Sequence, residues 1–132
     1  MQEIGNCKYY KLQNKATGLF LDGNKEGKIY GHTGNEGPFQ QWRFISVGNG
    51  FYKLQSRGTW LFLDGNEKGN IYGHTENDGP YQEWLLISVG NGYFKLVSKG
   101  TWLFLDGNKQ GNIYGHCGNN GPFQEWKIIP VK

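Results

Sequence analysis

Leu19-Phe20-Leu21-Asp22-Gly23-Asn24 returns unchanged at residues 61–66 and 103–108, so the chain repeats itself every 42 residues. Each copy is followed by an Ile-Tyr-Gly-His segment, a Gly-Pro pair and a Gln-x-Trp motif, which ends at Trp42, Trp84 or Trp126. Repetition at a fixed period indicates several copies of one structural unit. We therefore divide the chain into repeats 9–50, 51–92 and 93–132, within a single domain that spans residues 1–132.

Each repeat contains four short runs of aromatic and β-branched residues, which in the first repeat are 9–13, 19–21, 28–31 and 41–47. Runs of this length are typical of strands, and the Asp-Gly-Asn after the second run favours a hairpin. No window shows the apolar period of a helix. One four-stranded unit is too small to bury its apolar face. The sequence therefore predicts an all-β fold in which three units share one core, as a closed antiparallel barrel about a pseudo-threefold axis.

The composition, with 22 Gly, 16% aromatic and 19% charged residues, is typical of a small globular β protein. The net charge of +3 does not form a basic stripe that recurs with the period, so we expect no nucleic-acid partner. Residues 1–6 have neither a basic start nor an apolar run, so we expect no signal peptide and no membrane insertion. The expected location is cytoplasmic, or secreted without a visible signal peptide.

The two cysteines, Cys7 and Cys117, are too few to form a disulfide framework. Two free thiols are the expected state, and a bridge between them is the alternative. The oligomeric state stays open at the level of the sequence.

Three side-chain types that a sugar site requires recur in every repeat. A carboxylate accepts hydrogen bonds from neighbouring hydroxyls, an amide donates and accepts, and an aromatic ring packs against the apolar face of a sugar. Asp22, Asn35 and Tyr30 supply these groups in the first repeat. Each also has a structural interpretation: Asp22 as a turn former, Asn35 as a left-handed turn residue, and Tyr30 as a core residue. Alternation along the strand favours an inward Ile29 and an outward Tyr30.

The other recurring side chains receive different interpretations. We assign Trp42, Trp84 and Trp126 to the core, and their Gln partners to backbone groups of the loops. The three histidines could contact sugar at the rim of a site, be exposed or structural, or converge on a metal ion. The segment from Asp22 to Gly27 also resembles the opening of a calcium loop, but no Glu stands at the required twelfth position. We predict no metal and no cofactor.

The Gln-x-Trp motifs resemble those of β-trefoil lectins of the ricin B-chain type. The longer string, from Leu21-Asp22-Gly23-Asn24 to Phe39-Gln40 and Trp42, is similar to the repeat of the actinohivin group of high-mannose lectins. The resemblance implies a β-trefoil with one shallow pocket per subdomain, where Asp and Asn bind hydroxyls and rings pack against the pyranose. With the histidines added at the rim, the predicted carbohydrate-binding residues are Asp22, Tyr30, His32, Asn35, Phe39, Asp64, Tyr72, His74, Asn77, Tyr81, Asp106, Tyr114, His116, Asn119 and Phe123.

The expected function is a multivalent lectin with three equivalent sites for mannose-type glycans, carried by oligosaccharides, glycoproteins or glycolipids. Galactose or N-acetylgalactosamine is the alternative ligand, and a trefoil that binds protein or heparin is the alternative class. We expect no enzyme, because a glycosidase needs two carboxylates facing one bond and only one acidic position recurs in all repeats.

Two further expectations concern the individual sites. Replacing the recurring Asp with Asn is expected to weaken sugar binding by about 1.5–3 kcal/mol per site while leaving folding little changed, since Asn also suits the turn. The middle site is expected to differ from the others, because it carries Tyr81 and Glu76 where the first repeat has Phe39 and Gly34.

Overall fold

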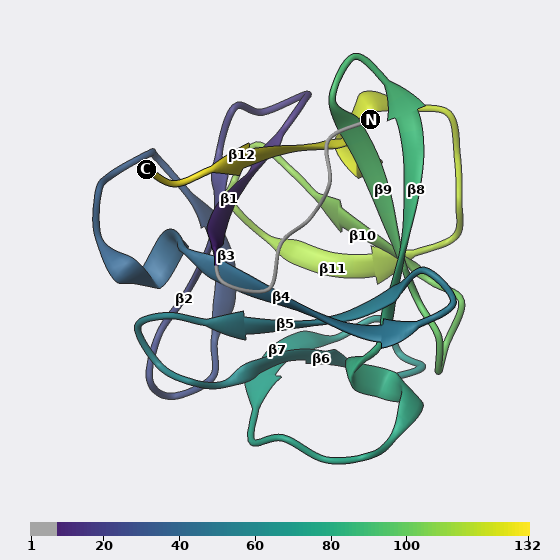
Figure 1. The fold of residues 1–132 in the computed structure, drawn as a ribbon. Helices are drawn as coiled ribbons and strands as arrows, with labels where there is room; N and C mark the ends of the chain where they lie inside the picture. Colours follow the sequence, from purple (N-terminus) through teal and green to yellow (C-terminus); the bar gives the residue numbers. More distant parts are fainter. Residues whose placement is uncertain (1–7) are drawn as a thin grey trace.

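The computed structural model describes residues 8–132, which form three four-stranded antiparallel units (Figure 1). The first unit consists of β1 (Tyr9–Asn14), β2 (Phe20–Gly23), β3 (Ile29–His32) and β4 (Trp42–Gly48). The second consists of β5 (Phe51–Ser56), β6 (Phe62–Gly65), β7 (Ile71–His74) and β8 (Trp84–Gly90). The third consists of β9 (Tyr93–Ser98), β10 (Phe104–Gly107), β11 (Ile113–His116) and β12 (Trp126–Pro130). This arrangement confirms the predicted all-β fold.

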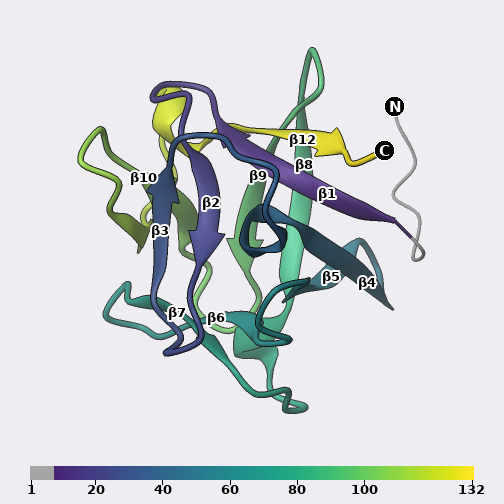
Figure 2. The same cartoon turned by 90° about the vertical axis from the view of Figure 1, so that its left-hand side faces the viewer.

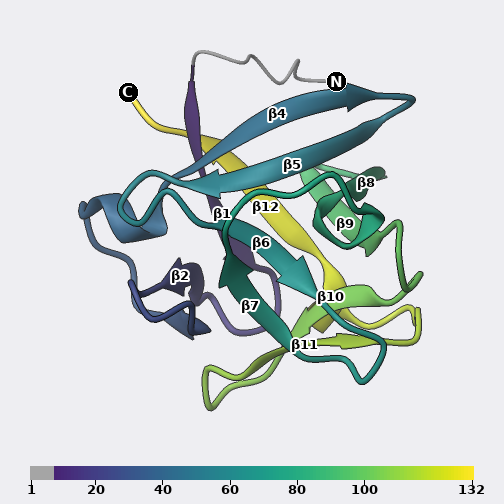
Figure 3. The same cartoon turned by 90° about the horizontal axis from the view of Figure 1, so that it is seen from below.

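Six of the twelve strands close into a barrel. β1, β4, β5, β8, β9 and β12 pair in that order, and β12 returns to β1, so every barrel strand has two antiparallel neighbours. The view from below shows these strands beside the hairpins that they support (Figure 3). Closure leaves no exposed edge in the barrel.

The remaining strands form the hairpins β2–β3, β6–β7 and β10–β11, the first of which stands upright in Figure 2. The register is the same in all three, and it places each recurring Asp opposite a Tyr, as in Asp22↔Tyr30. The predicted site residues of one repeat therefore come together on one hairpin.

Backbone hydrogen bonds of 2.8 Å join the three hairpins in a ring: Gly31 donates to Gly111, Gly73 to Gly27, and Gly115 to Gly69. The accepting glycines have φ between +86° and +88°, where side chains are strained. A Cβ at Gly27 would also lie 2.6 Å from the carbonyl oxygen of Gly73, and its two equivalents meet the same obstacle. Glycine is therefore required wherever one hairpin crosses the next.

The core lies inside the barrel and under the hairpins. Trp42, Trp84 and Trp126 are at most 1% exposed, which agrees with their assignment to the core. Each indole N–H donates a 3.0 Å hydrogen bond to the carbonyl oxygen of the residue before the recurring Asp, namely Leu21, Leu63 or Leu105. The buried tryptophans thus fix the backbone from which the site carboxylates project.

Three short 3₁₀ turns occur in the described chain: η1 (Pro38–Gln40), η2 (Pro80–Gln82) and η3 (Pro122–Gln124). Each begins with the proline of a Gly-Pro pair, whose fixed φ suits the first position of a helical turn. The turns place an aromatic residue toward a pocket and the next residue, Gln40 or its equivalents, in the interior.

Candidate functional site

Each hairpin and the 3₁₀ turn that follows it enclose a shallow pocket. The first pocket is lined by Asp22, Tyr30, His32, Asn35 and Phe39, and the equivalent residues line the second and third. All fifteen residues predicted from the sequence therefore lie in three pockets, five in each. The pocket volumes are about 420, 330 and 360 Å³ in chain order, near the lower limit for small-molecule sites. Each pocket is large enough to hold a sugar ring.

The carboxylate at the base of each pocket is 5% exposed and belongs to a hydrogen-bond network. In the first pocket, Oδ1 of Asp22 accepts from the backbone N–H of Gly23 at 2.8 Å, and Oδ2 accepts from Nε2 of Gln40 at 3.0 Å. The Gln40 amide is itself fixed, because it also donates to the carbonyl oxygen of Thr33 and accepts from the N–H of Asn35. Asp22 therefore orders the pocket loop in addition to facing the pocket.

This network argues against the expectation that Asn can replace Asp with little change in folding. An Asn at position 22 has one oxygen for two fixed donors, so its NH₂ must face either the Gly23 N–H or the Gln40 amide. We predict that Asp22→Asn lowers the free energy of unfolding by about 1–3 kcal/mol, the cost of leaving a buried donor unsatisfied. Urea denaturation measures this change, and an unchanged midpoint would show that the network tolerates the swap.

The recurring Asn is exposed and held through its backbone and its side-chain oxygen. Oδ1 of Asn35 accepts from the N–H of Gly37 at 2.9 Å, and its carbonyl oxygen accepts from Nζ of Lys11. Lys53 and Lys95 donate in the same way to the backbone carbonyl oxygens of Asn77 and Asn119. Among the described residues, the Asn35 Nδ2 group has no hydrogen-bond acceptor, so it is a positioned donor at the pocket.

The recurring Tyr lies on the outward side of its strand, as predicted. Ile29 is buried, and Ile71 and Ile113 pack against the core, whereas Tyr30 and its equivalents are half-buried and line the pockets. Burial, together with the charge of Asp22, raises the pKa of Tyr30 above its ordinary value of 10.0. Burial and the neighbouring Asp act on Tyr72 and Tyr114 in the same direction. The three hydroxyls therefore stay protonated at neutral pH and can donate to a ligand.

The recurring histidines lie exposed at the rims of the pockets. The rings of Tyr30 and His32 meet edge to face, with centroids 6.4 Å apart. Nδ1 of His32 lies 3.2 Å from the carbonyl oxygen of Thr33. The three histidines line separate pockets, and within residues 8–132 the structure has no cluster of three or more His, Cys, Asp or Glu side chains able to hold a metal ion.

Sequence reasoning missed two recurring pocket positions, a glycine (Gly23, Gly65 and Gly107) and the asparagine that follows it. Asn24, Asn66 and Asn108 line the three pockets, although the sequence indicated only a hairpin turn at these positions. Asn24 also stabilises the hairpin turn, because its Oδ1 accepts from the N–H groups of Glu26 and Lys28 at 3.0 Å. The signal that could have found this residue is its invariance across the three repeats.

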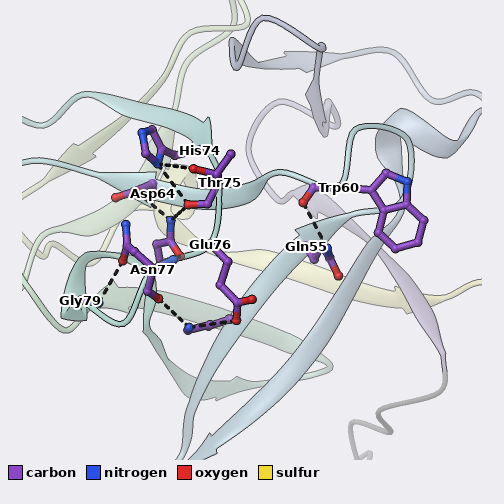
Figure 4. A network of polar contacts seen from close by, with 10 residues as sticks. Gln55, Trp60, Asp64, His74, Thr75, Glu76, Asn77 and Gly79 are labelled. Carbon is purple, nitrogen blue, oxygen red and sulfur yellow. Dashed lines mark hydrogen bonds and ion pairs between the residues drawn. The ribbon is translucent and has the colours of Figure 1, made fainter.

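The middle pocket differs in geometry from the other two. Glu76 forms an ion pair of 3.2 Å with Lys53, the residue that also holds the carbonyl oxygen of Asn77 (Figure 4). Tyr81 replaces Phe39 and is 37% exposed, and Glu67 adds a second carboxylate to the lining. Whether this pocket also differs in sugar binding stays a prediction.

The threefold barrel and its hairpins are those of a β-trefoil, and comparison with known proteins gives the family. The sequence matches the family described as "Ricin-type beta-trefoil lectin domain-like" over residues 2–79 and 38–126. The chain belongs to this family. The match supports the ricin-type resemblance but does not single out the actinohivin group. No curated protein matches the chain.

Solved structures agree with this assignment. The designed threefold-symmetric protein ThreeFoil has a TM-score of 0.86 and 28% identity, over 93% of this chain and 99% of that chain. An exo-β-1,3-galactanase from Clostridium thermocellum has a TM-score of 0.88 and 27% identity, over 98% of this chain but only 32% of the enzyme chain. The protein SeviL, bound to asialo-GM1 saccharide, shares the fold with a TM-score of 0.78 and 21% identity, over 92% of this chain and 96% of that chain.

Two other sequence predictions meet the structure only in part. Cys117 is exposed, but Cys7 lies outside the described residues, so the prediction of two free thiols stays a prediction. No helix in residues 8–132 is long and apolar enough to span a membrane.

Proposed function

We propose that this protein is a non-catalytic lectin whose three pockets each bind one sugar residue of a glycan. The observation that carries the proposal is the convergence, three times over, of a carboxylate, a positioned amide donor and two aromatic rings around a cavity large enough to hold a sugar ring. A carboxylate and an amide together match a pair of neighbouring hydroxyls, and the rings match the C–H face of the sugar. Membership of a lectin family supports the same conclusion.

Binding without catalysis fits the charges in each pocket. The first pocket has a single carboxylate in its lining, that of Asp22, and both of its oxygens are engaged by fixed protein donors. Glycosidic cleavage by the common route needs a second carboxyl group facing the same bond. The second pocket does hold Glu67, but its equivalents in the first and third repeats are Lys25 and Lys109.

Mannose-type glycans are the proposed ligand, on the basis of the similarity of the repeat to high-mannose lectins. Terminal galactose is the second candidate, because a related trefoil region occurs in a protein named as a β-1,3-galactanase. Both sugars have neighbouring hydroxyls and an apolar face, so the carboxylate, the amide and the rings of each pocket could bind either sugar.

Titration with methyl α-mannoside and methyl β-galactoside, followed by backbone amide NMR shifts, tests the proposal. We predict shifts at all three pockets and a stoichiometry near three sugars per chain. A monosaccharide of about a dozen heavy atoms, at roughly 0.3 kcal/mol per atom, gains about 3.6 kcal/mol, so each site should have millimolar affinity.

The same titration separates the competing ligands and classes. The sugar that shifts the pocket residues at lower concentration identifies the ligand type. Absence of shifts with both sugars, combined with salt-sensitive binding to heparin, would contradict the lectin proposal and favour the protein or heparin class. Release of free sugar from an oligosaccharide would contradict the non-catalytic part.

A further inference from the structure

Two tryptophans are far more exposed than any other large apolar side chain in residues 8–132. Trp60 is 64% exposed and Trp102 is 60% exposed, and they occupy the turns between β5 and β6 and between β9 and β10. The indole of Trp60 points away from the strands (Figure 4). In this view it lies well away from Asp64 and Asn77, which belong to the pocket of its own repeat. Neither tryptophan belongs to the core or lines one of the three pockets.

The backbone at both tryptophans has an unfavourable conformation. The φ angles are +68° at Trp60 and +62° at Trp102, in the left-handed region that strains a bulky residue. The first repeat has Gly18 at the equivalent position, with φ of +73°, and glycine adopts this conformation without strain. The turn therefore favours glycine, and folding alone does not account for an exposed tryptophan in two of the three repeats.

Each turn that carries a tryptophan lies against the pocket of the preceding repeat. A Cβ at Gly58 would lie 2.7 Å from the ring of Phe39, and a Cβ at Gly100 would lie 2.6 Å from the ring of Tyr81. These two rings line the first and second pockets. The backbone N–H of Arg57 also donates to the carbonyl oxygen of Gln41 at 2.9 Å, next to the 3₁₀ turn of the first repeat.

Trp60 follows Gly58 by two residues and Trp102 follows Gly100 by two, so each tryptophan lies in a turn that packs against a pocket residue of the preceding repeat. The third pocket is bordered by the turn of the first repeat, where the backbone N–H of Lys15 donates to the carbonyl oxygen of Glu125 at 2.9 Å. That turn carries Gly18 in place of a tryptophan.

We propose that Trp60 and Trp102 are secondary subsites, on which the second sugar residue of an oligosaccharide stacks while its first residue occupies the first or second pocket. This inference rests on the proposed lectin function. The first and second pockets are shallow, so a glycan longer than the part that enters them continues along the surface beside them. A flat, exposed ring is the group that packs against a pyranose face.

The surroundings of the tryptophans favour a sugar over a protein partner. Trp60 stands between Thr59 and Leu61 in the chain, and the Gln55 amide donates to the Trp60 carbonyl oxygen at 3.1 Å. Protein-binding surfaces usually require a larger contiguous apolar patch with a polar rim. Trp102 has the ring of Phe51 beside it, edge to face with centroids 6.5 Å apart, and one or two rings are still smaller than such a patch. An exposed ring of this kind matches a ligand that is apolar on one face and rich in hydroxyls at its edges.

The double variant Trp60→Gly/Trp102→Gly tests the inference, because it installs the residue that the first repeat already has in this turn. Titration calorimetry compares a monosaccharide with its disaccharide, mannobiose or β-1,3-galactobiose according to the sugar that the pockets accept. We expect unchanged monosaccharide affinity and a stoichiometry near three. We also expect the disaccharide to bind about 5- to 30-fold more weakly at two of the three sites than it does in the parent.

Two further measurements test the same inference without the double variant. Tryptophan fluorescence of the parent should change with the disaccharide but not with the monosaccharide. Gly18→Trp should increase disaccharide affinity at the third site, where the parent has no ring in the adjoining turn.

The outcomes distinguish this inference from the function on which it rests. Normal monosaccharide binding with equal disaccharide affinity in the parent and the double variant would overturn the inference alone. Failure of the parent to bind any sugar would overturn both. A double variant that keeps its disaccharide affinity but loses self-association in sedimentation, or loses binding to lipid vesicles, would assign the tryptophans to another partner and overturn the inference.

Discussion

Loss of one pocket donor is expected to weaken binding to a dense glycan surface by about 10- to 100-fold, although two pockets remain intact. The change is Asn35→Asp, Asn77→Asp or Asn119→Asp. The new carboxylate still accepts the hydrogen bond that Oδ1 of Asn35 receives from Gly37, but it replaces the free NH₂ with an acceptor. A sugar hydroxyl that donates its one proton to the Asp22 carboxylate and accepts from this amide then faces a second acceptor, and the lost hydrogen bond costs about 1.5–3 kcal/mol at that site.

The effect on surface binding follows from multivalency. Three linked sites can gain about 10²- to 10⁴-fold over a single site, so each further engagement is worth a factor of about 10 to 100. Surface plasmon resonance on an immobilised glycoprotein measures this loss, and calorimetry with the monosaccharide should show two unaltered sites. The triple variant should bind neither the surface nor the monosaccharide measurably.

The matched control is Asn49→Asp, which makes the same charge change at an exposed hairpin residue that lines none of the three pockets. It should leave surface binding at the parental level. A single-pocket variant that also binds the surface as well as the parent would contradict multivalent binding and indicate one dominant site.

Alanine at the hairpin crossings is expected to cause a large loss of stability. Gly27→Ala, Gly69→Ala or Gly111→Ala places a methyl group 2.6 Å from a carbonyl oxygen of the next hairpin, in a left-handed backbone conformation. Backbone strain and overpacking together should lower the free energy of unfolding by about 2–5 kcal/mol per site. The total stability of a small domain is about 5–15 kcal/mol, so the triple variant should not fold.

Gly48→Ala separates the two causes of this loss. Gly48 has φ of +94°, but no atom lies within 4 Å of the position that its Cβ would take. Its replacement should cost only about 1 kcal/mol, for the strained backbone. Urea denaturation of both variants gives the comparison, and an equal loss would show that the crossing contact contributes nothing.

Most of the fold could be predicted from the strands expected in one repeat, because the other two repeats have the same pattern. The predicted run 9–13 became β1 at Tyr9–Asn14, and the run 41–47 became β4 at Trp42–Gly48, because strand alternation and turn residues are local properties. The clustering of Asp22, Tyr30 and Phe39 was likewise predictable from the repeat, and the structure brings these residues to one pocket. That they bind sugar stays a prediction.

Contacts between repeats could not be predicted, because a periodic pattern contains no information on which atoms meet across a boundary. The packing of Gly58 against Phe39 and the hydrogen bond from Gly73 to Gly27 both join different repeats. The double role of Asp22 was also hidden, because Gln40, which binds its carboxylate, was assigned only to loop backbone groups. The exposed state of Trp60 depends on the same long-range arrangement.

The ring of hairpin hydrogen bonds has a consequence for the symmetry of assembly. Each hairpin donates to one neighbour and accepts from the other, and β4, β8 and β12 each pair with the first strand of the next unit. The contacts between units are therefore heterologous, head-to-tail interfaces, and they close into a ring after three copies. One repeat therefore contains both complementary surfaces of a cyclic trimer. The peptide links between repeats hold close together surfaces that each repeat already contains.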